Sequence, residues 1–133
     1  MSGGEIVIHS LDHARAALAA AAALRVPVTV ASAPGAAAQA GPGWFKAVVA
    51  EAQAAYPDTA VTAILDCGDE PGAVMAALRA GLTALRFGGA AETRAKLEAT
   101  GAHFIPPSSS DATLDLLEAR DANAACHAFL AAR

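Results

Sequence analysis

The chain has 133 residues, carries a net charge of −4, and is 55% hydrophobic and 17% charged. This size suits one domain with one hydrophobic core. The composition is too apolar for a disordered segment, and no apolar run is long enough to span a membrane. The acidic balance and the scattered Lys and Arg residues argue against nucleic acid as a partner. We therefore expect one soluble domain, residues 1–133, with neither a nucleic-acid nor a membrane partner.

The two cysteines and the most apolar segment indicate in which cellular compartment the protein is expected. Cys67 and Cys126 form no CxxC pair, and a domain of this size needs no disulfide. Residues Ala16–Leu24 form an alanine run. It follows a segment of mixed charge that contains Glu5, Asp12, His13 and Arg15 rather than a cationic leader, which favours a helix over a signal peptide. A cytoplasmic location is expected.

Five short apolar segments alternate with longer segments rich in Ala, Leu and Glu, a pattern typical of parallel βα units. The expected strands are Glu5–His9, Val26–Ala31, Val61–Asp66, Ala84–Phe87 and His103–Ile105. The expected helices are Leu11–Leu24, Gly43–Tyr56, Pro71–Ala80, Ala90–Thr100 and Ala112–Ala132. Gly81 and Gly101 each follow a helix where a left-handed cap is needed. The sequence predicts an α/β protein with a parallel sheet.

Strand order decides which loops meet. Pro27 in the second strand and Pro106 after the short fifth strand favour the sheet edges for both strands. We therefore expect a three-layer sandwich with the flavodoxin-like order 2-1-3-4-5, rather than the sequential order of a partial (βα) barrel. In the expected order the topological switch point, where such sheets bind ligands, falls between the first and third strands. The loop Ser32–Pro42, rich in Ala, Gly and Pro, is the candidate lid.

The composition of the first expected helix suggests that the protein forms an oligomer. Leu11–Leu24 is Ala or Leu on nearly every face, so part of it is expected to pack against a second subunit as well as the sheet. A homodimer is predicted.

The segment after the third strand carries the candidate catalytic residues. Asp66 has the chemistry of a general base or a metal ligand and Cys67 that of a nucleophile, and His9 is expected to reach both across the switch point. The alternative is structural, with Asp66 bonded to loop amides and Cys67 buried as a small hydrophobe. No spacing here matches a recognised metal motif, so no metal site is predicted, and no cofactor is indicated.

An anion site is predicted after the fourth and fifth strands. Arg86 precedes a Gly-Gly junction that opens a helix, where backbone amides and the helix dipole favour negative charge. The predicted ligand-binding residues are Arg86, Gly88, Gly89, Ser108, Ser109 and Ser110. A phosphate- or carboxylate-bearing small molecule is the expected ligand.

Two short resemblances bear on function. The stretch 77–81, Ala-Leu-Arg-Ala-Gly, with an Asp ending the third strand, resembles a response-regulator receiver domain and implies Asp66 as phosphoacceptor. His9-Ser10 stands where receivers have an acidic pair and Ile105 where they have Lys, so Asp66 is expected to stay unphosphorylated. The stretch 80–87 is similar to a strand of keto-deoxy-phosphogluconate aldolases, but Arg86 stands at the position of the Schiff-base Lys.

Three functions therefore remain open. The favoured one is a binder of a small anionic ligand at the carboxyl ends of the strands. The second is a receiver-like interaction module without phosphotransfer. The third is a lyase or isomerase that acts on a carbonyl compound through Asp66, Cys67 and a histidine.

Overall fold

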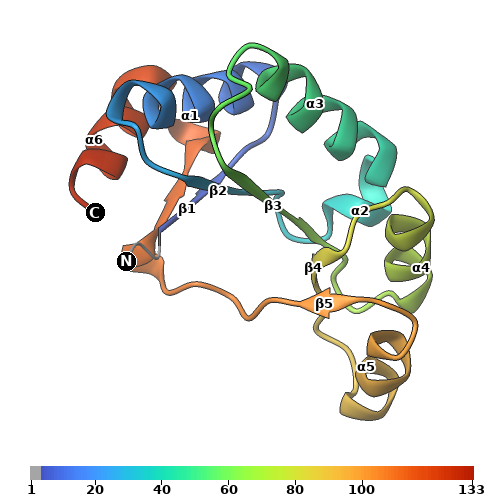
Figure 1. Ribbon diagram of the computed structural model, residues 1–133. Coiled ribbons are helices and arrows are strands. Elements are labelled where there is room, and N and C mark those ends of the chain that lie inside the picture. The colour runs from blue at the N-terminus through green and yellow to red at the C-terminus, as the bar shows by residue number, and fades with distance from the viewer. Residues whose placement is uncertain (1–3) are drawn as a thin grey trace. The chain divides into compact units, whose positions relative to one another are not determined.

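The computed structural model describes residues 4–133, which form an α/β fold with one six-stranded parallel sheet and six α-helices (Figure 1). The strands are β1 (Glu5–Val7), β2 (Val28–Ala31), β3 (Val61–Asp66), β4 (Ala84–Arg86), β5 (His103–Phe104) and β6 (Thr113–Asp115). The helices are α1 (Leu11–Leu24), α2 (Ala36–Gln39), α3 (Pro42–Ala54), α4 (Pro71–Arg79), α5 (Ala91–Glu98) and α6 (Ala122–Ala131). The α/β class and the parallel sheet are confirmed.

The described chain divides into two compact units that interleave along the sequence. Unit 1 comprises residues 4–31, 48–63 and 108–133, and unit 2 comprises residues 32–47 and 64–107. Helix α3 and strand β3 each contribute residues to both units. The number of domains stays a prediction.

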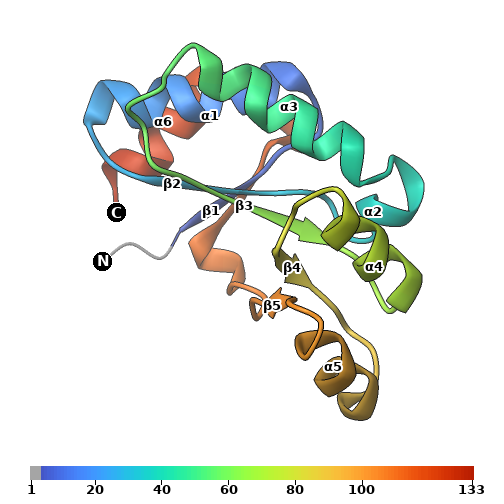
Figure 2. The ribbon, with the colours of Figure 1, turned by 45° about the vertical axis from the view of Figure 1, so that its right-hand side comes forward.

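In unit 1, helices α1 and α6 lie side by side, as Figures 1 and 2 show. Helix α1 begins after Ser10, whose hydroxyl caps it by accepting a hydrogen bond from the His13 amide. Its buried positions are alanines except for Leu18, and such small side chains let α1 approach its neighbours closely. Since α6 covers part of α1, the apolar surface that suggested a second subunit has a partner within the chain. The homodimer stays a prediction.

The expected strand order is wrong at one place, because β2 rather than β1 lies beside β3. The order is β5-β4-β3-β2-β1-β6, sequential over the first five strands as in the partial-barrel alternative. The amide of Val28 donates to Ala60 O, and that of Ser32 to Ile64 O, both at 3.0 Å. Pro27 lies just before β2 rather than inside it, so its missing N–H leaves no gap in the ladder. The expected switch point between β1 and β3 is therefore absent, while β5 is at an edge as predicted.

The expected helix Ala112–Ala132 is also wrong in its first half. Residues 113–115 form β6, which pairs with β1 in the register Val7 opposite Asp115. A 3₁₀ turn, Leu116–Glu118, follows, and α6 begins after Asp121, whose carboxylate accepts from the Ala124 amide. Pairing with a strand far away in sequence overrides the local helix propensity of this segment.

In unit 2, strands β3, β4 and β5 pair in parallel. Gly81 and Gly101 have φ values of +91° and +112°, which confirms the left-handed caps predicted for α4 and α5. Leu65, Val74 and Leu85 are fully buried. These residues hold the strand ends that carry the candidate site.

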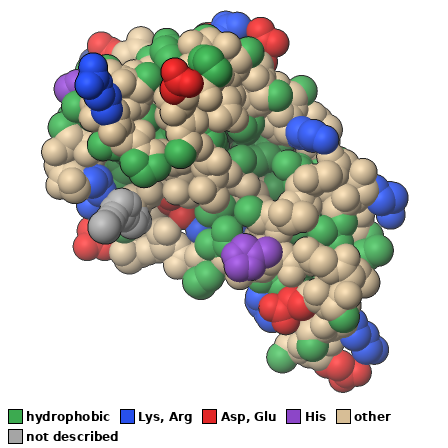
Figure 3. Space-filling view, in the orientation of Figure 1, with side chains coloured by type: hydrophobic (Ala, Val, Ile, Leu, Met, Phe, Trp, Pro, Cys, Tyr) green, Lys and Arg blue, Asp and Glu red, His purple; other side chains and the backbone are tan. Residues whose placement is uncertain are grey.

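The surface drawn in Figure 3 shows Lys and Arg side chains standing apart from one another rather than gathered in one patch. Among the described residues, no helix is both long enough and apolar enough to cross a membrane.

Candidate functional site

Asp66 ends strand β3 and joins two loops of unit 2. Its Oδ1 atom accepts hydrogen bonds from the amides of Gly35, at 3.0 Å, and Gly68, at 2.8 Å. Its own amide donates to the Ser32 hydroxyl at 2.9 Å. Gly35 and Gly68 have φ values of +71° and +59°, a conformation that costs a residue with a side chain about 1–2 kcal/mol. The carboxylate is therefore held in one orientation, and no hydrogen bond within residues 4–133 occupies Oδ2.

Cys67 is fully buried, and its backbone amide donates to Arg86 O at 2.9 Å. Burial, reinforced by the negative charge of Asp66, raises the pKa of the Cys67 thiol to about 11. A nucleophilic cysteine needs its thiolate near neutral pH and access to substrate. The geometry therefore favours the structural alternative for Cys67, as a small buried side chain.

Cys126 is buried as well, and burial raises its pKa to about 11. We expect neither thiol to react with iodoacetamide in the folded protein at pH 8, since access and thiolate are both lacking. Both should react once the chain is unfolded in urea, and mass spectrometry of the alkylated peptides measures this. Rapid native labelling of Cys67 would restore it as a candidate nucleophile.

The loop after β4 carries the predicted anion site. The Arg86 guanidinium donates through Nη2 to Pro106 O at 3.2 Å. The Gly88 amide donates to Gly68 O at 2.7 Å, so this hydrogen bond ties the loops after β3 and β4 together. Of the two glycine amides predicted to bind an anion, the Gly88 amide is therefore already hydrogen-bonded within the protein.

Arg94 is a residue of this region that sequence reasoning missed. It lies one turn into α5, donates to Phe87 O, and has its guanidinium carbon 5.8 Å from the centre of the Phe87 ring and 5.2 Å from that of Phe104. The two rings stack with centres 5.5 Å apart. The sequence feature that could have identified Arg94 is its position in the first turn of a helix, five residues after Gly89. Unit 2 therefore has one half-buried arginine at the end of β4 and a second in α5.

The remaining predicted residues belong to unit 1. His9 Nε2 lies 2.6 Å from Asp115 Oδ1, a partner that the sequence did not suggest. Ser108 donates to Glu5 Oε1 at 2.7 Å, and Ser109 O accepts from the Thr113 hydroxyl at 2.8 Å. Ser110 is exposed and begins a 3₁₀ turn. The structure thus pairs His9 with Asp115, and the predicted approach of His9 to Asp66 and Cys67 stays a prediction.

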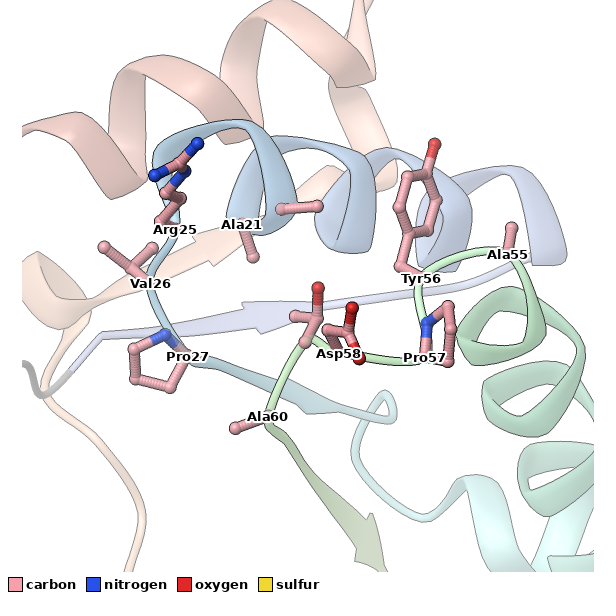
Figure 4. Close-up of a pocket in the computed structure, with 11 residues that line it drawn as sticks. Ala21, Arg25, Val26, Pro27, Ala55, Tyr56, Pro57, Asp58 and Ala60 are labelled. Carbon is pink, nitrogen blue, oxygen red and sulfur yellow. The ribbon is translucent and has the colours of Figure 1, made fainter.

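Unit 1 also holds a pocket of about 640 Å³ at the amino ends of β2 and β3 (Figure 4). Its polar side chains are those of Arg25, Tyr56, Asp58 and Thr59, and prolines and alanines form much of the remainder. None of the predicted site residues lines it. Across residues 4–133, no group of three or more His, Cys, Asp or Glu side chains is arranged to hold a metal ion.

Comparison with known proteins shows the family of the chain. Among curated proteins, nothing matches it. Residues 3–96 match the family described as Fructose-bisphosphate aldolase class-II. This segment includes β1 to β4 and contains Asp66, Arg86 and Arg94. Because the match covers well over half of its length, the chain belongs to the class-II fructose-bisphosphate aldolase family.

Proposed function

We propose that this chain is a lyase-type enzyme that acts on a small phosphorylated carbonyl compound, with Asp66 as its acid–base group. The observation that carries the proposal is the fixed carboxylate at the end of β3, in a chain of the aldolase family. The family name specifies a sugar bisphosphate and an aldolase reaction, and both come to this chain as part of the proposal. The third of the functions left open by the sequence thereby moves ahead of simple anion binding.

The geometry of Asp66 suits proton transfer. A general base needs a defined orientation and a lone pair that faces substrate. Two amides orient Oδ1, which leaves Oδ2 to accept a proton. In an aldol cleavage the base takes the proton of the hydroxyl group β to the carbonyl. The carbon–carbon bond then breaks, the aldehyde leaves, and the resulting enolate recovers the proton at its carbon.

The surroundings of β4 suit the phosphate of such a substrate. Arg86 at the end of this strand and Arg94 in α5 each carry a guanidinium group, the side chain best suited to a phosphate, and they donate to Pro106 O and Phe87 O. The sequence-based anion site at Arg86, Gly88 and Gly89 is retained in the proposal, with Arg94 added. Ser108, Ser109 and Ser110 remain proposed ligand-binding residues from unit 1.

The test compares Asp66→Asn with the parent protein on fructose 1,6-bisphosphate. Asparagine retains an oxygen that accepts from the Gly35 and Gly68 amides, but it cannot accept a proton at neutral pH. We expect binding, measured by calorimetry, to change by less than about threefold and cleavage to fall by about 10²-fold or more. Asp69→Asn is the matched control, because Asp69 is an exposed carboxylate of the same loop. Its cleavage rate should equal that of the parent.

Two results would contradict the proposal. Cleavage by Asp66→Asn at the parent rate removes Asp66 from the chemistry. Binding without cleavage by the parent favours the second candidate function, a binder of phosphorylated compounds that performs no reaction. The specific observation in favour of this candidate is the protonated, buried thiol of Cys67 beside a carboxylate already bonded to two amides.

A further inference from the structure

Unit 1 contains a separate cluster of proton-transfer groups at the carboxyl ends of β1 and β6. Val7 pairs with Asp115, and His9 follows Val7 by two residues, so His9 and Asp115 lie on the same face of the sheet. His9 Nε2 is 2.6 Å from Asp115 Oδ1, and the two side chains are 20% and 52% exposed. The pair is therefore in contact and accessible to solvent.

The protonation states of Asp115 and His9 follow from their hydrogen-bond partners. Burial opposes ionisation of Asp115. Hydrogen bonds from the Leu117 amide and His9, together with the positive charges of His9 and His13, outweigh the effect of burial and lower the pKa of Asp115. An ionised carboxylate requires the proton of His9 to lie on Nε2, which leaves the lone pair on Nδ1. No hydrogen bond within residues 4–133 occupies that atom.

His13 supplies the complementary group. Its Nδ1 accepts the His9 backbone N–H at 3.0 Å, so the neutral ring carries its proton on Nε2. Burial, and then the neighbouring His9, lower the pKa of His13 against the opposing charges of Asp115 and Asp12, which favours this neutral form. The two imidazole rings have centres 5.7 Å apart and are nearly perpendicular. One ring thus provides a proton acceptor and the other a hydrogen-bond donor.

We propose that His9 and Asp115 form a general-base dyad that activates water against small esters, with His13 donating to the ester carbonyl oxygen. His9 Nδ1 removes a proton from water as the water oxygen bonds to the carbonyl carbon. The tetrahedral intermediate then expels the alcohol, which takes the proton from His9. His9 is the catalytic residue, and Asp115 is a positioning residue that holds the tautomer and stabilises the imidazolium. This activity belongs to unit 1 and does not depend on Asp66.

The experiment measures p-nitrophenyl acetate hydrolysis by the full chain and its variants. We expect His9→Gln to lower kcat/KM by about 10²-fold or more. Asp115→Asn should lower kcat by about tenfold or more with little change in KM, because asparagine removes the charge and no longer fixes the tautomer. The matched control is His127→Gln, since His127 is an exposed histidine on α6 of the same unit, and its rate should equal that of the parent.

Long-range ¹H–¹⁵N spectra provide a readout that a purely structural role would not change. The parent should show His9 protonated at Nε2, and Asp115→Asn should show a mixture of tautomers. A parent rate no higher than that of free imidazole at equal concentration overturns the proposal, as does an unchanged rate in folded His9→Gln. Should His9→Gln fail to fold, an unchanged rate and tautomer in Asp115→Asn would overturn it equally.

Discussion

Replacement of Phe45 by Ala should lower the free energy of unfolding by about 3–5 kcal/mol, because truncation of a large core side chain loses its transfer free energy and leaves a cavity. Phe45 lies in the first turn of α3 and is 0% exposed, the largest of the fully buried side chains. A loss of this size is a large share of the stability of a typical domain. Urea unfolding followed by circular dichroism measures it.

The neighbouring residue provides the control. Trp44 has a larger side chain but is 37% exposed, so Trp44→Ala should cost no more than about half as much. Equal losses in the two variants would mean that exposure does not distinguish these adjacent aromatic residues, and the inward orientation of Phe45 would be wrong.

Replacement of Gly89 by Ala should destabilise the loop after β4 by about 1–3 kcal/mol through overpacking. A Cβ atom at Gly89 would lie 2.3 Å from Cζ of Phe87, well inside contact distance. The ring has little freedom to move, because it stacks on Phe104 and Arg94 lies over both rings. The same urea titration measures the loss.

Gly88→Ala is the matched control for this loop. The nearest atom to its added Cβ is Gly68 O at 3.8 Å, an ordinary contact. We expect a change within about 0.5 kcal/mol. A variant Gly89→Ala as stable as Gly88→Ala would show that the Phe87 ring yields freely, and that the packing of Phe87, Phe104 and Arg94 is loose.

Local pattern was enough to predict much of the fold. The bounds of α1 and β3 are those expected from the sequence, since a capping serine and an apolar run ending in Asp66 are both local signals. The same signal located the carboxylate at a strand end, where parallel sheets place their sites. Its hydrogen bonds to loop amides were foreseen as the structural alternative.

Long-range pairing explains what the sequence did not reveal. Residues 113–115 are too few to outweigh an alanine-rich neighbourhood, and only β1 makes them a strand. Asp115 is 106 residues from His9, so no spacing rule connects them. Strand order was misjudged because Pro27 was counted within β2. An error of two residues at the start of this strand led us to place a central strand at the edge.

The pairing of β1 with β6 has a consequence for the order in which the chain folds. The end of β3 and strands β4 and β5 belong to unit 2 and follow one another closely, so their pairing closes short loops. Strand β1 instead completes its pairing only when residues 113–115 return to it across all of residues 32–107. Closing so long a loop is entropically unfavourable and slow. During synthesis, all strands of unit 2 are complete before residues 113–115 are made. Ile6 and the apolar face of α1 are fully covered only after almost the whole chain has been synthesised.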